Sequence, residues 1–209
     1  MLSLELPIIP PEERPERKDA AENRHLILAT ASRLFEQKGV ENVCMSEIAK
    51  AAGVGKGTLY RRFSGKGELC LALLDKELMR FQDTVLNTFR QQTADGLTGC
   101  QQLNWFIDHA VHFTDTHLSL MVEISDVGSD QAVQDINQPH FWMEMTVKAL
   151  LQQIKDGGDL SADLDLDYVT SALLSPLDAR IMKAHRVNRG YSTTQISQGL
   201  QSLINSLCH

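Results

Sequence analysis

The chain has 209 residues, of which 43% are hydrophobic, enough for one medium domain or for a small domain joined to a medium one. Its formal net charge of −7 argues at first against a nucleic-acid partner. The sequence contains no apolar run of about eighteen residues, which excludes a membrane-spanning helix and leaves no membrane partner to expect.

The first seventeen residues predict a disordered tail. They hold four of the six prolines together with a mixed run of charges. Their apolar stretch lacks a positively charged start and is broken by prolines, so it does not resemble a signal peptide. The absence of an export signal predicts a cytoplasmic protein.

Three helices are expected in residues 18–66, which we treat as one domain. From about Ala20, apolar residues recur with helical spacing, and Gly39 suits the left-handed residue that ends such a helix. The residues of this stripe are Ile27, Leu28, Ala31, Leu34 and Phe35. Two short helices follow, over 45–52 and 56–63, and Gly53 permits the tight turn between them.

Residues 67–209 predict a second, larger helical domain. A long helix is expected from Lys66 to about Gln92, and the later helices over 97–116, 118–127, 131–156, 165–186 and 193–207. No window shows the two-residue alternation of a strand. We therefore expect an all-α fold of about nine helices.

Charge is distributed unevenly between these two regions. Residues 18–70 carry nine basic and six acidic residues, whereas residues 71–209 carry nine basic and seventeen acidic ones. An acidic body repels phosphates, so only the first region can face a nucleic acid.

The sequence of residues 43–69 forms the most informative motif. Ile48, Ala49 and Ala52 make the inner face of one short helix, and Leu59 and Phe63 that of the next. Together with the first helix, this stretch resembles the TetR family of transcriptional regulators. The resemblance is carried by Arg24-x-x-Ile27-Leu28-x-x-Ala31-x-x-Leu34-Phe35, Ile48-Ala49-x-x-Ala52-Gly53-Val54, Gly57-Thr58-Leu59-Tyr60-x-x-Phe63 and Lys66-x-x-Leu69.

The resemblance implies that the second short helix enters the major groove of DNA. Base edges would be read by Lys56, Gly57, Thr58 and Arg61, and Arg61 is the best candidate for a bidentate contact to guanine. Phosphates would be held by Ser46, Tyr60 and Lys66. Outside such a motif, these polar residues would be interpreted as an ordinary solvated helix face.

Cys44 departs from the family pattern, which has Thr or Ser at this helix cap. A thiol is a weak acceptor, so the capping box with Glu47 is incomplete and loses roughly 1 kcal/mol. A tolerated substitution is the simpler interpretation, and a thiol sensor beside DNA is the alternative. The four cysteines, Cys44, Cys70, Cys100 and Cys208, are widely spaced and are expected to be reduced thiols.

The resemblance also implies that the helical body binds a small-molecule effector and that the last two helices form a homodimer. The apolar ridges of these helices agree with a four-helix interface, although they could instead only cover their own body. The ridges contain Val169, Leu173, Leu177, Ile181, Ile196, Leu200, Leu203 and Leu207.

Aromatic residues and methionines are enriched in residues 105–145, where we expect the effector pocket. Ordinary core packing is the competing interpretation for each of them. The candidates are Trp105, His109, His112, Phe113, Met121, Phe141, Trp142 and Met145, with His109, Glu123 or His140 as polar selectors.

His109 and His112, with Asp108, Asp115 and His117 nearby, raise the possibility of zinc binding. Histidines at this spacing are common on helices and no cysteine joins them, so we expect no metal and no cofactor. The sequence also lacks a nucleophile elbow, a phosphate-binding glycine loop and a zinc signature, which argues against an enzyme.

These observations predict a homodimeric repressor that binds a palindromic double-stranded DNA operator and leaves it when a small ligand binds. The alternative is an architectural or ligand-independent DNA-binding protein of the same fold. The size of any cavity in the body separates the two.

Overall fold

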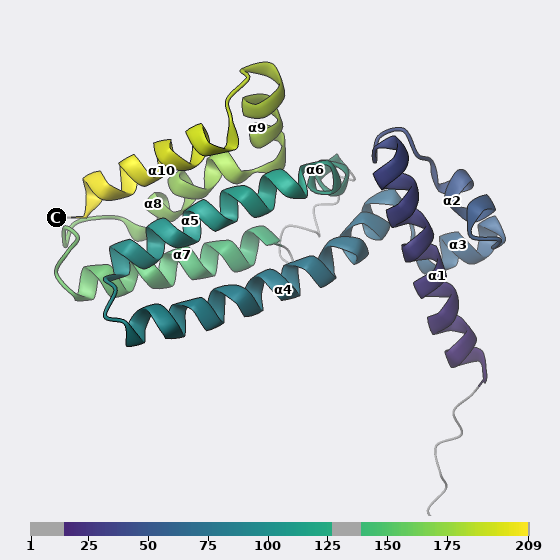
Figure 1. The fold of residues 1–209 in the computed structure, drawn as a ribbon, viewed down its shortest axis with the longest axis horizontal. Coiled ribbons are helices and arrows are strands. Elements are labelled where there is room, and N and C mark those ends of the chain that lie inside the picture. The colour runs from purple at the N-terminus through teal and green to yellow at the C-terminus, as the bar shows by residue number, and fades with distance from the viewer. Residues whose placement is uncertain (1–14, 127–138, 209) are drawn as a thin grey trace, which may run out of the picture. The chain divides into compact units, whose positions relative to one another are not determined.

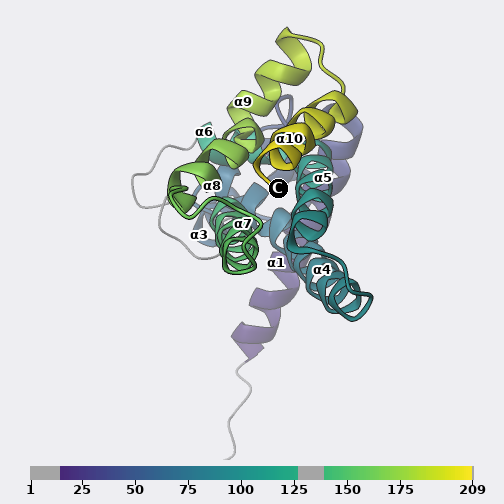
Figure 2. The same ribbon diagram turned by 90° about the vertical axis from the view of Figure 1, so that its left-hand side faces the viewer.

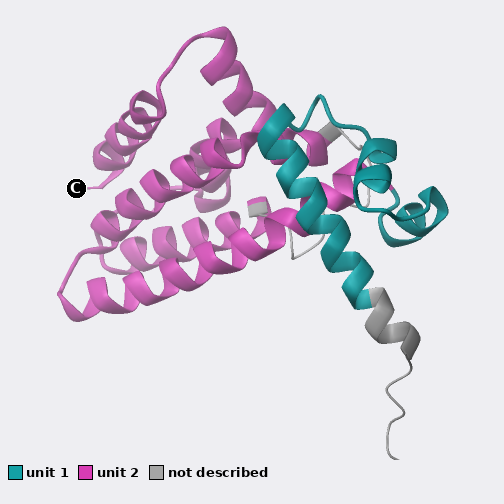
Figure 3. Ribbon diagram, turned by 45° about the vertical axis from the view of Figure 1, so that its right-hand side comes forward, with its two compact units in different colours: residues 1–64 teal, residues 65–209 magenta. Residues whose placement is uncertain are grey.

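The computed structural model describes residues 15–126 and 139–208, and every regular element in these ranges is helical (Figure 1). The chain divides into two compact units, Met1–Ser64 and Gly65–His209, shown in different colours in Figure 3. The expected all-α fold is therefore confirmed for the described residues. Most of the expected tail and the first part of the helix expected over 131–156 lie outside them.

Unit 1 contains the helices α1 (Pro15–Lys38), α2 (Met45–Ala51) and α3 (Lys56–Arg62). Its core is built from the apolar positions of the sequence motif, and Ile27, Ile48 and Leu59 are completely buried in it. The turns use glycine as expected: Gly39 ends α1 at φ +82° and Gly53 lies between α2 and α3 at φ +66°.

Unit 2 begins with the long helix α4 (Lys66–Ala94). It continues with α5 (Gly99–Thr116), α6 (Leu118–Asp126), α7 (Pro139–Asp156), α8 (Leu166–Leu174), α9 (Ala179–Lys183) and α10 (Thr193–Leu207). A single turn of 3-10 helix, Ser175–Leu177, precedes α9, and a turn of π-helix, Ala184–Asn188, follows it.

Helix α5 packs against α10, and α7 packs against α8 (Figure 2). Helix α5 also packs against α7, and α4 packs against α6. Side chains from these helices form one continuous core, in which Phe106, Val147 and Leu174 are fully buried. Within the described ranges, each helix is too short or too polar to cross a bilayer.

The helix expected over 165–186 is interrupted, which corrects the sequence prediction. Pro176 lies in the 3-10 turn, and Asp178 follows it with ψ 135°, outside the helical region. Oδ1 of Asp178 then accepts the backbone N–H groups of Arg180 (2.9 Å) and Ile181 (3.1 Å) and begins a new helix. A proline and an N-cap residue this close together favour a break that apolar periodicity alone does not reveal.

Polar and covalent links join α5 to α10 in antiparallel register. Asn104 donates to Asn205 (2.8 Å), Ser197 donates to Asp108 (2.6 Å), and Thr193 donates to Asp115 (2.5 Å). At one end of this series, Cys100 and Cys208 form a disulfide, with their Cα atoms 6.5 Å apart.

The disulfide shows that the expectation of four reduced thiols was wrong for Cys100 and Cys208. Cys44 and Cys70 are free. Cys70 is fully buried, and this burial, together with the negative charge of Glu123, raises the pKa of its thiol to about 12. Cys70 is therefore protonated and unreactive at neutral pH.

Candidate functional site

The outer face of α3 carries the polar residues of the motif. Leu59 and Phe63 are buried and fix the helix in unit 1. Lys56, Gly57, Tyr60 and Arg61 are exposed on the other side, and Thr58 is half-buried. The structure thus brings together five of the seven residues predicted to contact DNA, on one helix with no acidic side chain.

The start of α2 supplies Ser46, which is also exposed. Its hydroxyl lies 3.0 Å from the sulfur of Cys44, and the Cys44 side chain makes no capping hydrogen bond to the helix. The carboxylate of Glu47 accepts instead from Lys38, at 2.5 Å. The hydrogen bond with Ser46 is the main cause of a lowered pKa of the Cys44 thiol.

A cation–π contact supports the end of α3. The guanidinium carbon of Arg24, in α1, lies 5.4 Å from the centre of the Phe63 ring. The family motif contains both residues, and the contact explains physically why a basic side chain suits the first position of that motif.

Lys66, the seventh predicted DNA contact, is the first residue of α4 and belongs to unit 2. Its Nζ lies 3.1 Å from Oε2 of Glu123 in α6, and both side chains are mostly shielded from solvent. The predicted phosphate contact and the predicted polar selector are therefore ion-pair partners in the structure.

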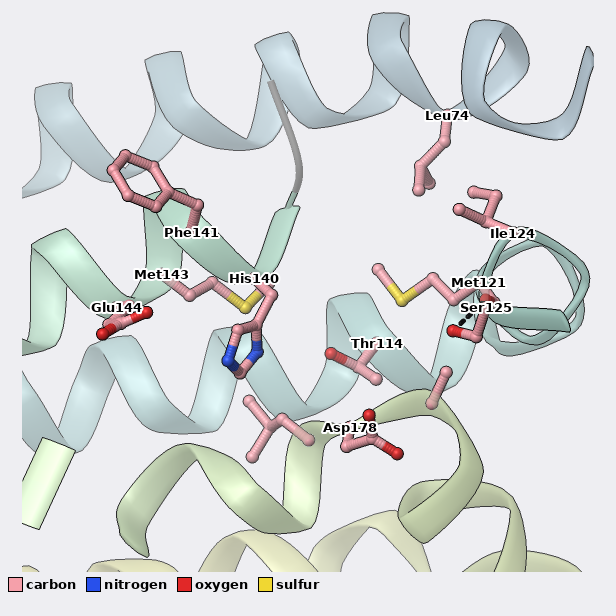
Figure 4. Close-up of a pocket in the computed structure, with 12 residues that line it drawn as sticks. Leu74, Thr114, Met121, Ile124, Ser125, His140, Phe141, Met143, Glu144 and Asp178 are labelled. Carbon is pink, nitrogen blue, oxygen red and sulfur yellow. Dashed lines mark hydrogen bonds between the residues drawn. The ribbon is translucent and has the colours of Figure 1, made fainter. Parts of the chain in front are cut away.

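Unit 2 contains a cavity of about 390 Å³, within the range of small-molecule sites (Figure 4). Its apolar lining comes from helices far apart in sequence: Leu74 of α4, Met121 and Ile124 of α6, and Met143 of α7. The remaining lining residues are Thr114, Ser125, His140, Phe141, Glu144, Leu177, Asp178 and Ala179.

Two of the eight predicted ligand-binding residues, Met121 and Phe141, line this cavity. Phe113 and Trp142 belong instead to an aromatic cluster around Phe81. Trp105 stacks on His109, with ring centres 3.9 Å apart, and packs edge-on against Phe89.

The other two predicted residues lie on the surface. Met145 is exposed, and His112 is exposed with its Nδ1 2.8 Å from the backbone carbonyl of Asp108. His109 likewise places Nδ1 2.8 Å from the carbonyl of Trp105. Among the described residues, no group of three His, Cys, Asp or Glu side chains has an arrangement that could hold a metal ion.

Several residues of the cavity lining were missed by sequence reasoning. Asp178 and Ala179 come from the break between α8 and α9, which the sequence signals only through Pro176 and the capping residue itself. Ser125 and Thr114 occupy ordinary positions within helices, and no sequence pattern distinguishes them from other polar residues of those helices. Of the proposed selectors, His140 reaches the cavity lining, whereas His109 and Glu123 do not.

The helices expected to dimerise show both buried and exposed apolar residues. Leu173, Leu177, Ile196 and Leu200 pack into the core of unit 2, whereas the side chain of Leu203 is 58% exposed. Further exposed apolar residues in this part of the chain are Tyr168, Ile181, Val187 and Tyr191. We call these five exposed residues the uncovered apolar surface.

Comparison with known proteins agrees with the motif. Residues 27–73 match the model of the bacterial regulatory proteins of the tetR family. An HTH-type transcriptional regulator of Staphylococcus aureus strain MRSA252 is 30% identical over 176 residues, which cover 84% of this chain and 89% of that protein. The chain spans about half the length of further curated S. aureus regulators, matching them over 97 residues at 38% identity.

Solved structures share the fold at lower identity. The regulator FadR of Bacillus subtilis, in complex with stearoyl-CoA, has a TM-score of 0.65 at 19% identity and covers 88% of this chain and 99% of its own. A putative transcriptional regulator of Saccharomonospora viridis, in complex with choline, has a TM-score of 0.59 at 19% identity and covers 90% and 98%.

The curated relatives are transcriptional regulators rather than enzymes. The matched residues include the exposed face of α3 and the buried residues that hold it in place. The chain belongs to the TetR family of DNA-binding transcriptional regulators.

Proposed function

We propose that this regulator is a homodimeric repressor that a small ligand releases from a palindromic operator. The observation that carries the proposal is the cavity of about 390 Å³ inside the body of a DNA-binding regulator. An architectural DNA-binding protein needs no such cavity, whereas a regulator controlled by a small molecule needs a concave site of about this size.

For DNA recognition, we assign base reading to Lys56, Gly57, Thr58 and Arg61 in the major groove. Ser46 and Tyr60 would contact phosphates, supported by their exposure. Lys66 stays in this set because an ammonium group has three N–H donors and Glu123 accepts from one of them.

We assign the dimer interface to the uncovered apolar surface defined above. A palindromic site requires two reading helices about one helical turn, roughly 34–36 Å, apart. Leu203→Glu places a charge in this interface and is expected to give monomers in light scattering after size-exclusion chromatography. Leu86→Glu is the matched control, because Leu86 is similarly exposed (49%) but lies on α4.

For ligand control, we propose that α4 acts as the responsive element. It contributes Leu74 to the cavity, and its first residue, Lys66, follows the boundary between the two units by two positions. A ligand that favours one position of α4 and α6 would change the separation of the two reading helices and lower the affinity for DNA.

The target of the protein is DNA, which agrees with the cytoplasmic location expected from the sequence.

The decisive experiment fills the cavity. Ala179→Leu adds apolar volume to the lining and should abolish release by ligand while DNA binding, measured by fluorescence anisotropy on genomically selected fragments, stays intact. Ala94→Leu, at the exposed end of α4 and outside the lining, is the control. Unchanged release in Ala179→Leu contradicts this cavity as the effector site. Failure of every compound of a broad ligand library to release the wild type favours the ligand-independent alternative.

The two structural relatives bind different chemistries, an acyl-CoA in one and choline in the other. Their ligands therefore leave the class of effector open for this chain. The class of ligand has to be inferred from the residues around the cavity of this chain.

A further inference from the structure

We propose that the cavity takes an amphiphilic cation: a molecule with an apolar body and a positively charged amine or quaternary ammonium group. This inference rests on the proposed function, because it names the ligand class of the cavity that we assign to the effector.

The charge of the lining is the first argument. The described residues that line the cavity include two acidic side chains, Glu144 and Asp178, and no lysine or arginine (Figure 4). Arg180 follows Asp178 by two residues, and its Nη2 donates to the backbone carbonyl of Ser125 at 2.8 Å. Even with Arg180 counted and histidine taken as neutral, the acidic residues exceed the basic ones, and this surplus attracts a cation.

The second argument is the geometry of Asp178. Its two capping hydrogen bonds, from the backbone N–H groups of Arg180 and Ile181, both end on Oδ1. Oδ2 takes part in neither bond, so the cap leaves one oxygen of this lining carboxylate uncommitted. The cap also fixes the carboxylate in position before a ligand arrives, which reduces the entropy cost of binding.

The remaining lining suits the apolar part of such a ligand. Met121 and Met143 contribute flexible thioether side chains that adapt to alkyl or aryl shapes, and Leu74 and Ile124 enclose the same space. The imidazole of His140 and the hydroxyl of Thr114 add hydrogen-bonding groups at the polar side of the cavity (Figure 4).

The same lining disfavours anionic ligands. Fatty acids carry a carboxylate and acyl-CoA molecules carry several phosphate charges, and proteins bind such groups with arginine and lysine side chains. In this cavity an anionic group would instead face Glu144 and Asp178, and like charges repel.

Three probes with the same ten-carbon chain test the proposal: decyltrimethylammonium, decanamide and decanoate. Their dissociation constants are measured on the full-length protein by isothermal titration calorimetry, below the concentrations at which the probes aggregate. We expect decyltrimethylammonium to bind at least tenfold more tightly than decanoate, equivalent to about 1.4 kcal/mol, with decanamide between them.

Isosteric variants locate the source of this preference. Glu144→Gln and Asp178→Asn remove one charge each, and asparagine caps a helix as well as aspartate does. Each is expected to reduce the cation-to-carboxylate preference at least threefold. Asp163→Asn, on the exposed loop before α8, removes the same charge outside the lining and should leave the preference unchanged. Thermal unfolding checks that each variant folds. If Asp178→Asn does not fold, Glu144→Gln alone tests the source of the preference.

The outcomes separate this inference from the proposed function. Equal or tighter binding of decanoate, or a preference that survives in both variants, overturns the cationic ligand class. If decanoate binds more tightly than decyltrimethylammonium and also releases DNA, the assignment of the cavity to the effector is supported and only the ligand class is wrong. If no probe binds, or if Ala179→Leu leaves binding intact, the assignment of the cavity itself fails.

Discussion

The ammonium group of Lys66 and the carboxylate of Glu123 form an ion pair, 3.1 Å apart, between the first turn of α4 and the middle of α6. The side chains are 16% and 26% exposed, so solvent screens the pair only partly. Helix α6 lines the cavity through Met121, Ile124 and Ser125. The pair therefore connects a helix that touches the proposed ligand to the start of the helix that we propose to respond.

A double-mutant cycle measures this connection. Lys66→Met and Glu123→Gln should each lower the free energy of unfolding by about 1–2 kcal/mol, between the values typical of exposed and of buried ion pairs. The double variant should lose less than the sum, because each single change leaves one charge without its partner. Strict additivity in urea denaturation would show that the two charges do not interact.

Arg61→Ala tests the reading face of α3. We expect a loss of about 1–3 kcal/mol in affinity for the operator and reduced discrimination at one base pair, because Arg61 is exposed and unaccompanied by acids on its helix. Lys66→Ala should instead weaken binding to all sequences alike and reduce the salt dependence. Equal losses on specific and random DNA for both variants would mean that another residue reads the bases.

Cys44→Ser should stabilise unit 1. The thiol makes no capping hydrogen bond to α2, whereas a serine hydroxyl at the same cap can accept from the helix N–H groups, typically worth about 1 kcal/mol. The rise in stability is measured by thermal unfolding. Cys70→Ser should instead lower the stability, because it buries a hydroxyl in a core site. The same Cys44→Ser protein tests the thiol-sensor hypothesis. If oxidant lowers operator affinity equally little in variant and wild type, that hypothesis is wrong.

The disulfide between Cys100 and Cys208 should contribute strongly to stability. It joins residues 108 positions apart, and closing a loop of about 100 residues is worth up to roughly 4.7 kcal/mol through the unfolded chain. Cys208→Ser should lower the free energy of unfolding by about 2–5 kcal/mol under oxidising conditions. A dithiol reductant should bring the wild type to the level of the variant and leave the variant unchanged. A wild type indifferent to reductant would indicate that the disulfide adds no stability.

Asp115 should make unit 2 sensitive to acid. Burial alone would raise the pKa of its carboxyl, but hydrogen bonds from Thr193 and from Nε of Arg186 (2.6 Å) outweigh burial and lower it. A lowered pKa stabilises the folded state above the ordinary value, about 3.9, and this contribution disappears as the pH falls through the folded-state pKa. Asp115→Asn should therefore be less stable at pH 7 by about 1–2 kcal/mol and lose less stability between pH 5 and pH 2. Parallel acid unfolding of both proteins would refute this role.

The sequence predicted unit 1 well because its signals are local. The stops at Gly39 and Gly53 require positive φ, and the inner residues of each short helix follow fixed spacing within one motif. Side chains such as Arg61 and Tyr60 are exposed simply because the opposite face of α3 is apolar. Each of these signals joins residues that lie only a few positions apart in the sequence.

The cavity and the disulfide depend on contacts between distant elements, which periodicity does not encode. Trp142 and Phe141 are adjacent in sequence, yet one joins the aromatic core and the other lines the cavity. Cys100 meets Cys208 only because α5 and α10 pack in antiparallel register over several turns. Aromatic and methionine enrichment over residues 105–145 covers part of the lining of this cavity but does not separate core residues from lining residues.

The interruption between α8 and α9 places Leu177, Asp178 and Ala179 against the cavity, and Tyr168 and Ile181, on the two helices that it joins, belong to the uncovered apolar surface. A bound ligand and a second subunit would thus both contact the short backbone segment between α8 and α9 or the helices next to it. Thermodynamic linkage then makes the two equilibria reciprocal: a ligand that alters subunit affinity must itself bind with an affinity that depends on protein concentration. The cellular abundance of the regulator would in that case help set the ligand concentration to which it responds.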